Sequence, residues 1–233
     1  IMSTRYNPSI VRDSLVLYVD AANSKSYSGS GTAWTDISGR ENNMTLVNGA
    51  SFDSGNKGSI SFDGTNDYVD GDFTSDVQFG TGDFTFSTWL LLDSSTSNQN
   101  VFDTRKDAGS GASFADRQGF MLRTTDNTTY DFRFDASSLQ TFSAPVDVFN
   151  NIVISRISGT VNIHVNNSLS QSFSNTSNNN VQGKLRLGAF IDSAQDQHVF
   201  HGKFSQFMVY KGKGLTATEV EQNYNALKGR FGI

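Results

Sequence analysis

The chain has no cysteine and only two prolines among its 233 residues. The absence of cysteine excludes disulfides, thiolate catalysis and zinc sites built on cysteine. Because a secreted eukaryotic domain would often carry disulfides, their absence favours a protein that folds in bacterial cytoplasm. Ile1 precedes Met2, which indicates a processed or fragmentary start.

Basic clusters and long apolar runs are also missing. The net charge is −5 and the pI is near 5.1, whereas phosphate binding needs clustered Lys and Arg, so nucleic acid is not an expected partner. No apolar stretch approaches the roughly 20 residues that span a bilayer, so no membrane insertion is expected. Only 18% of the residues are charged, and Ser, Thr, Asn and Gly are abundant, which is typical of extracellular or virion β proteins.

Short strand-like segments dominate the chain, each bounded by Gly, Asn, Asp or Ser. In residues 130–135, Tyr130, Phe132 and Phe134 share one face, while the alternate residues are charged and are expected to face water. No repeat of 20–50 residues and no linker is visible. The pattern predicts an N-terminal arm at 1–13 and one all-β domain at 14–233.

A tight hairpin is expected at Asn166 and Asn167, because asparagine tolerates a positive φ. His164 lies in the preceding strand among apolar neighbours and is expected to be structural. Residues 84–92 are apolar at both odd and even positions, which predicts a strand shielded on both faces. Phe86 and Trp89 are expected in the core or in sheet packing.

The C-terminal segment has the pattern of a helix over 216–228. Thr216 and Glu219 have the spacing of a capping box, and Gly229 is the expected C′ residue. Val220, Tyr224 and Leu227 form one apolar face at helical period. After the helix, the tail ends in two apolar residues that either dock on a neighbouring subunit or fold back onto the sheet; docking is the expectation, with contact residues Phe231 and Ile233.

Four stretches together resemble the concanavalin A-like (laminin G-like) superfamily. They are 15–49, 59–69 ("SISFDGTNDYV"), 84–92 ("FTFSTWLLL") and 200–227. The resemblance implies a jelly-roll sandwich of two antiparallel sheets with a short C-terminal helix. It also implies that the first strand lies near the last, and that the helix covers an edge or an end of the sandwich.

The two ends of the chain carry a narrower resemblance. Residues 4–27 and 223–233 are similar to laminin G-like domains in structural proteins of tailed bacteriophages, particularly those of cyanobacteria. This implies a non-enzymatic virion protein: a capsid decoration, neck, tail or fibre component whose partners are other virion proteins or copies of itself. The alternative is a carbohydrate-binding adhesin that recognises host-surface glycans, on a virion, in the extracellular space or on a bacterial surface.

Catalysis is not expected, although the superfamily includes glucanases. Retaining glycoside hydrolysis needs two carboxyl groups about 5–5.5 Å apart, and the glucanases supply them as glutamates on one strand. This chain has three glutamates: Glu41 in a turn, and Glu219 and Glu221 in the predicted helix. No serine lies in a nucleophile-elbow motif.

Calcium is the expected cofactor if a cofactor is bound, because aspartates are numerous in turns and oxygen ligands suit this ion. Aspartate is also a common turn residue, which is the structural alternative. Pentraxin-like members of the superfamily hold calcium between two loops, which correspond here to 103–119 and 186–198. The resemblance thus implies four candidate ligands: Asp107, Asp116, Asp192 and Asp196.

Glycan recognition needs exposed aromatic rings beside amide and carboxylate groups. Three phenylalanines near the two loops are candidate contacts: Phe114, Phe190 and Phe200. Burial in the core is the alternative for each of them.

Overall fold

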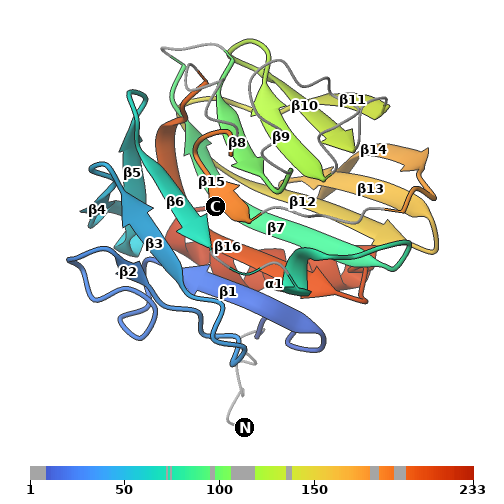
Figure 1. Cartoon of the computed structure of the whole chain (residues 1–233), viewed down its shortest axis with the longest axis horizontal. Coiled ribbons are helices and arrows are strands. Elements are labelled where there is room, and N and C mark those ends of the chain that lie inside the picture. The colour runs from blue at the N-terminus through green and yellow to red at the C-terminus, as the bar shows by residue number, and fades with distance from the viewer. Residues whose placement is uncertain are drawn as a thin grey trace, which may run out of the picture.

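The computed structural model describes residues 9–71, 73, 75–94, 98–105, 119–134, 138–178, 184–191 and 198–233. Within these residues the chain forms a sandwich of two eight-stranded sheets, A and B, with antiparallel pairing throughout (Figure 1). One α-helix, α1 (Ala217–Leu227), follows the last strand. The predicted all-β jelly-roll fold with a short C-terminal helix is confirmed.

Sheet A contains both the first and the last strand. Its members are β1 (Leu15–Asp20), β4 (Ser51–Asp53), β5 (Ser59–Asp63), β7 (Phe84–Leu92), β12 (Phe149–Ile157), β13 (Thr160–Val165), β14 (Ser168–Ser174) and β16 (His201–Lys211). Their order is β14-β13-β12-β7-β16-β5-β4. The free side of β16 pairs with β5 near its start and with β1 near its end, so the implied neighbourhood of first and last strands is confirmed.

Sheet B has the order β11-β10-β9-β8-β15-β6-β3-β2. Its strands are β2 (Ala33–Trp34), β3 (Met44–Val47), β6 (Tyr68–Gly71), β8 (Asn100–Asp103), β9 (Phe120–Thr124), β10 (Thr129–Phe134), β11 (Ser138–Ser143) and β15 (Leu185–Leu187). Because β15 lies between β8 and β6, the sheet brings residues from distant parts of the chain onto one surface.

The space between the sheets is filled mainly by phenylalanine. Phe84, Phe86 and Phe120 are almost fully buried, and their ring centroids lie 4.7–5.5 Å apart. Burial of each such side chain contributes roughly 1.5–3 kcal/mol. In β7, Phe86 points into this core, whereas Trp89 belongs to a second apolar cluster on the other side of sheet A, so shielding of both faces is confirmed.

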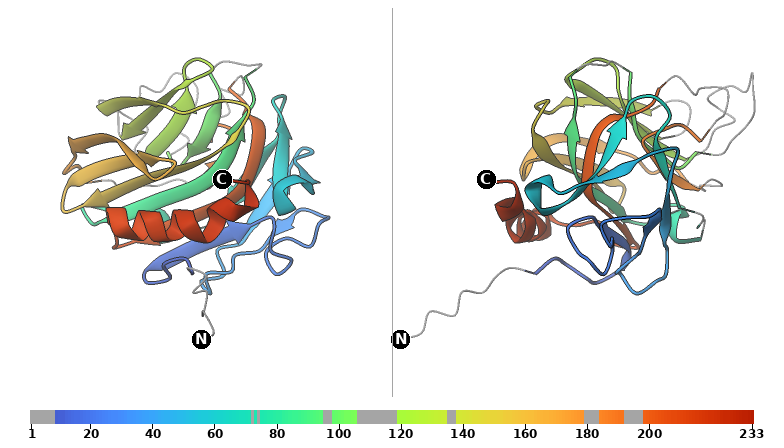
Figure 2. Two further views of the ribbon diagram at one scale, coloured as in Figure 1. Left: turned by 180° about the vertical axis from the view of Figure 1, so that it is seen from behind. Right: turned by 90° about the vertical axis from the view of Figure 1, so that its left-hand side faces the viewer.

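Helix α1 covers the outer face of sheet A, not an edge or an end of the sandwich (Figure 2, left). The capping box is confirmed: the Glu219 amide donates to Thr216 Oγ1, and the Thr216 amide donates to the Glu219 carboxylate. Val220 and Leu227 are buried, and the ring of Tyr224 stacks on Trp89 with centroids 5.4 Å apart. The helix lies on this face because β1, β7, β12 and β16 present apolar side chains outwards there.

The C-terminal tail folds back onto sheet A. The ring of Phe231 stacks on Trp89 with centroids 4.3 Å apart, and it also contacts Phe149. Arg230 Nη1 donates to both carboxylate oxygens of the buried Asp20 at 2.9 and 3.0 Å, and its Nη2 donates to Ser205 Oγ. The expectation of a free docking arm is therefore wrong for Phe231, whose ring already has a partner in its own chain.

Two further details of the termini differ from expectation. Gly229 is not a left-handed C′ residue, because α1 continues as a 3-10 turn, η5 (Lys228–Arg230), and the positive φ is at Gly232. In the expected N-terminal arm, residues 9–13 lie against α1: the Val11 amide donates to Asn223 Oδ1, and Gln222 donates to the Ser9 carbonyl. Residues 1–8 lie outside the described part of the chain.

The outer face of sheet B carries charged side chains packed in pairs. Asp131 is fully buried and accepts hydrogen bonds from both Arg123 and Arg133. The expectation that the charged residues of β10 face water is therefore wrong for Asp131. Asp103 forms a two-point ion pair with Arg105 at 2.8–2.9 Å. Each of these two buried carboxylates thus has an arginine partner.

The expectation of a tight turn after β13 is confirmed. Asn166 and Asn167 both have positive φ, at 49° and 68°, in the two-residue turn between β13 and β14. His164 is buried, and burial lowers its pKa, in accord with a structural role. Within the described residues, no helix has the length and apolar character needed to cross a membrane.

Candidate functional site

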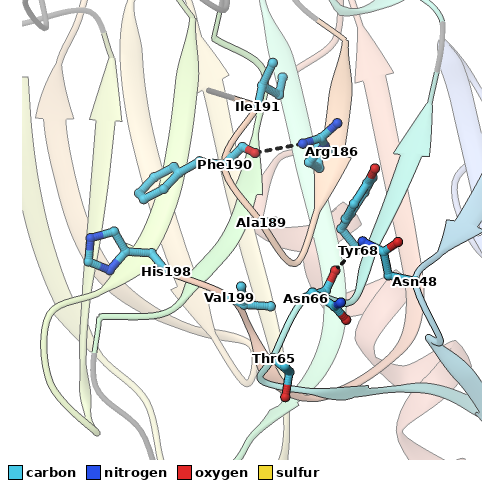
Figure 3. Close-up of a pocket in the computed structure, with 10 residues that line it drawn as sticks. All are labelled: Asn48, Thr65, Asn66, Tyr68, Arg186, Ala189, Phe190, Ile191, His198 and Val199. Atoms are coloured by element: carbon cyan, nitrogen blue, oxygen red, sulfur yellow. Dashed lines mark hydrogen bonds between the residues drawn. The ribbon is translucent and has the colours of Figure 1, made fainter. Parts of the chain in front are cut away.

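A cavity of about 430 Å³ opens at the side of sheet B where β6 and β15 meet (Figure 3). Its walls come from the β3–β4 turn, the β5–β6 turn, strand residues of β6 and β15, and residues 189–191 and 198–199. We call it the Tyr68 pocket. It is lined by Asn48, Thr65, Asn66, Tyr68, Arg186, Ala189, Phe190, Ile191, His198 and Val199.

Gly188 brings the chain that follows β15 close to the core. Its φ is +88°, and a Cβ there would lie 2.7 Å from the ring of Phe62 on β5. A side chain is excluded on both grounds, so only glycine fits this position. The close approach turns the chain directly after β15 and places Ala189 and Phe190 at the pocket.

One wall of the pocket is a stack of Tyr68 and Arg186. These side chains come from β6 and β15, and the Arg186 guanidinium carbon lies 4.1 Å from the centre of the tyrosine ring. Asp70 faces Arg186 across the two strands and accepts from its Nε and Nη2 at 2.7 and 3.0 Å. Burial by itself would lower the pKa of Arg186, but the bonds to Asp70 raise it above its ordinary value.

The opposite wall contains Phe190 and His198. The Phe190 ring meets the His198 ring edge to face at 5.3 Å, and Arg105 lies against the same phenylalanine. The Phe190 carbonyl accepts from Arg186 Nη1 at 2.9 Å, which joins the two walls. His198 Nδ1 lies 2.8 Å from the Asn98 carbonyl, so in the neutral ring this nitrogen is the donor and Nε2 is left as an acceptor.

The rim of the pocket consists of amides and a hydroxyl. Asn48 Nδ2 donates to the Asn66 carbonyl and holds the β3–β4 turn to the β5–β6 turn. Thr65 and Asn66 are themselves exposed. Behind them, Asp67 Oδ2 accepts from the Asp63 amide, and burial raises the pKa of the Asp67 carboxyl.

The Tyr68 pocket thus combines half-buried apolar and aromatic surface with neutral hydrogen-bonding groups. Such a mixture suits a ligand that has hydroxyl groups and apolar C–H faces. Within the described part of the chain, no group of three or more His, Cys, Asp or Glu side chains is arranged to hold a metal ion.

The three glutamates lie where the sequence indicated. Glu41 has a positive φ in a turn, and Glu219 caps α1 and pairs with Lys213 at 2.8 Å. Glu221 is exposed on the same helix. None of the three belongs to a strand.

The sequence-based candidates have different outcomes. Phe190 lines the pocket, as do Arg186 and His198 at the two ends of the predicted 186–198 loop. Phe200 is fully buried against Phe62 and Phe204, so its expected role in ligand contact is wrong. Five candidates lie outside the described residues: Asp107, Phe114, Asp116, Asp192 and Asp196.

The two candidate contact residues of the tail, Phe231 and Ile233, also have different environments. Phe231 is held by Trp89, whereas Ile233 is 54% exposed and borders a cavity of about 250 Å³ beside Phe149 and Val148. A role of Ile233 in partner contact stays a prediction.

Sequence reasoning missed most of the pocket. Tyr68, Thr65 and Asn66 lie within "SISFDGTNDYV", which indicated the fold but not a site. The available signal was the pair of polar turns at Asn48–Gly49 and 63–67, each directly beside a strand. Their proximity became visible only in the sheet order, where β3, β6 and β15 are adjacent.

Residues 63–221 match the family model described as the concanavalin A-like lectin/glucanases superfamily. The match covers more than half of the chain, which therefore belongs to this family. No curated protein matches the sequence.

Solved structures with the same fold include toxin domains and a sialidase. The binding domain of Paraclostridial Mosquitocidal Protein 1 has a TM-score of 0.66 and 16% identity over 92% of this chain and 52% of its own. The receptor binding domain of botulinum neurotoxin C/D mosaic serotype has a TM-score of 0.70 and 13% identity, covering 92% and 51% of the two chains. Trypanosoma rangeli sialidase has a TM-score of 0.66 and 12% identity, over 95% of this chain and 34% of its own.

This chain thus spans about half the length of the toxin domains and about a third of the sialidase. At these identities the likeness shows the fold alone.

Proposed function

We propose that this chain is a glycan-binding module and that the Tyr68 pocket holds the sugar. The observation that carries the proposal is the pocket itself: neutral amide, hydroxyl and imidazole groups surround half-buried Tyr68, Ala189 and Ile191. Support also comes from the fold, which the chain shares with domains described as binding or receptor binding domains.

Each type of group has a role in this proposal. The apolar C–H face of a sugar ring packs on the half-buried apolar side chains. Sugar hydroxyls exchange hydrogen bonds with Asn48, Asn66 and Thr65, and one hydroxyl donates to His198 Nε2. Because Asn48 and Arg186 are already held by bonds within the protein, little side-chain ordering is needed when the ligand binds.

A virion structural role for the whole protein also stays a proposal. It is supported by the resemblance of residues 4–27 and 223–233 to phage structural proteins, and a glycan-binding module can itself be part of a virion. Mass spectrometry of purified particles tests it: the chain is expected among the particle proteins, and its consistent absence would exclude this role. The absence of catalysis and the binding of calcium by the four aspartates likewise stay predictions.

A glycan array probed with the purified chain tests the main proposal. We expect binding to a defined set of glycans, and loss of most of that binding in Asn66→Ala, which removes an exposed amide at the pocket rim. The matched control is Asn178→Ala, an exposed asparagine outside the pocket. Absence of binding at millimolar ligand, or equal loss in both variants, would contradict the proposal.

Thermal unfolding with calcium and with EDTA tests the calcium prediction. If the ion stabilises the loops at 103–119 and 186–198, it adds about 2.7 kcal/mol of stability at a hundredfold excess over its dissociation constant. EDTA should then lower the melting temperature. An unchanged melting temperature, with no metal found by elemental analysis, would exclude the site.

A further inference from the structure

Arg186 is the permanently charged side chain that lines the Tyr68 pocket, but its charge is matched by a neighbour. Asp70 binds the guanidinium at two points, with both side chains only about one-fifth exposed, at 18% and 21%. Asp70 itself does not line the pocket. A ligand in the pocket therefore meets the planar edge of a guanidinium whose positive charge is balanced by the Asp70 carboxylate.

The described lining of the pocket contains no lysine and no second arginine. Arg105, behind Phe190, is paired with Asp103. On the other side, the β5–β6 turn contributes Asp63 and Asp67, which are both acidic. Neither of them lines the pocket, so the charge that a negatively charged ligand meets first is that of Asp70, with which it would have to compete for Arg186.

We infer that the Tyr68 pocket selects uncharged sugars, such as neutral hexoses and N-acetylhexosamines, and that Asp70 determines this specificity by neutralising Arg186. The inference rests on the proposed glycan-binding function and names the class of glycan. Asp70 acts through Arg186 and does not touch the ligand. Discrimination arises because an acidic sugar finds no unpaired arginine here and is repelled by the Asp70 carboxylate.

Arg186 still contributes hydrogen bonds to a neutral sugar. A guanidinium has five N–H groups, and the described residues accept from it at Nε, Nη1 and Nη2 once each. One N–H on each Nη atom is left for sugar hydroxyls. In contrast to a free arginine, this one is fixed in orientation by Asp70, by the Phe190 carbonyl and by the ring of Tyr68.

The variant Asp70→Asn tests the inference, because it keeps the side-chain shape and one acceptor for Arg186 but removes the charge. The probes are matched pairs of glycans, each neutral oligosaccharide beside the same oligosaccharide carrying a sialic acid, a glucuronic acid or a sulfate. We expect the wild-type protein to bind the neutral member at least tenfold more tightly. In Asp70→Asn this ratio should fall at least tenfold, and the gained binding of the acidic member should weaken as salt is raised from 50 to 300 mM.

Two further variants keep the test specific. Asp53→Asn removes the same charge from a partly exposed ion pair with Lys203 outside the pocket, and it should leave the ratio unchanged. The double variant Asp70→Asn with Arg186→Gln is again uncharged at this pair, and it should restore the preference for neutral glycans. If Asp70→Asn is not folded by circular dichroism, the wild-type ratio and the double variant still decide.

The results separate this inference from the function on which it rests. A wild-type preference for acidic glycans, or equal effects of Asp70→Asn and Asp53→Asn, overturns the inference and leaves glycan binding intact. Absence of binding to any member of the pairs overturns the proposed function and the inference together.

Discussion

The two sheets of the sandwich treat their outer faces in opposite ways. The outer face of sheet A is apolar and is covered by the chain itself, through α1, η5 and Phe231. The outer face of sheet B carries ion pairs of aspartate and arginine, and the Tyr68 pocket opens at its side. The outer face of sheet A is thus covered by other residues of the same chain. The outer face of sheet B presents polar groups that can form further hydrogen bonds.

The difference has a simple physical basis. Apolar surface is stabilised by removal from water, so a short amphipathic helix that binds its own sheet contributes to folding. Paired charges and amides already have partners in the protein and in water, so they contribute little further stability when covered. They are, however, the groups that distinguish one polar ligand from another. We therefore expect the outer face of sheet A to contribute mainly to stability, and we propose that the outer face of sheet B serves recognition.

Replacement of one aromatic ring on each outer face should separate the two roles most strongly. Trp89→Ala removes a fully buried ring that contacts Tyr224 and Phe231, and it should lower the free energy of unfolding by about 3–5 kcal/mol. Tyr68→Ala removes a half-buried ring and should cost less than half as much, but abolish glycan binding. Urea denaturation and the glycan array measure the two effects. Similar stability losses in the two variants would contradict the different roles of the two faces.

A truncation after Lys228 tests whether the tail belongs to the covered face. It removes the Phe231 ring and leaves the buried Asp20 without Arg230, with an expected loss of about 2–4 kcal/mol. Burial also raises the pKa of Tyr18, which keeps its hydroxyl protonated as a donor to Asp20. This one remaining bond is not expected to compensate for the loss of the guanidinium.

Thermal unfolding of the 1–228 chain should therefore be roughly 5–10 °C lower than that of the full chain. Glycan binding at 20 °C should be retained, because the tail lies on the other sheet. An unchanged melting temperature would mean that the tail is not part of the folded core and would revive its role as a docking arm.

A smaller effect is expected at the edge of the Tyr68 pocket, where the pKa of Asp67 is raised by burial. A raised pKa in the folded state means that folding favours the protonated carboxyl. The contribution of Asp67 to stability is therefore least favourable above the raised pKa and improves as pH falls toward the unfolded value near 3.9. Asp67→Asn should be more stable than the wild-type protein at pH 7.5, with a smaller difference at pH 4.5. Equal differences at both pH values would contradict the assignment.

Much of the fold could be predicted because local patterns and global packing agree. The capping box at Thr216, the turn at Asn166–Asn167 and the doubly buried strand around Trp89 each depend on a few neighbouring residues. The position of α1 could not be predicted in the same way. An apolar helix face predicts that the helix packs on the sandwich, but the sequence does not show whether it packs on an edge or on a face of a sheet.

The site was less predictable for a related reason. Phe190 and Phe200 have the same appearance in the sequence, as aromatic residues near loops, and both are buried. Only Phe190 lies at the pocket, and the sequence does not distinguish the two. Tyr68, Asn48 and Arg186 are far apart in the chain and meet only because β15 pairs with β6 and β6 with β3. The neutral character of the pocket depends on the cross-strand pair of Asp70 and Arg186, which no local pattern indicates.

An amide NMR titration of the full chain, with the neutral glycan that binds best on the array, tests directly whether the Tyr68 pocket holds the ligand. We expect the largest chemical-shift changes in residues 63–68, 186–191 and 198–199, with no significant changes in α1. Largest changes at the tail or along the outer face of sheet A, or no changes at millimolar glycan, would contradict this expectation.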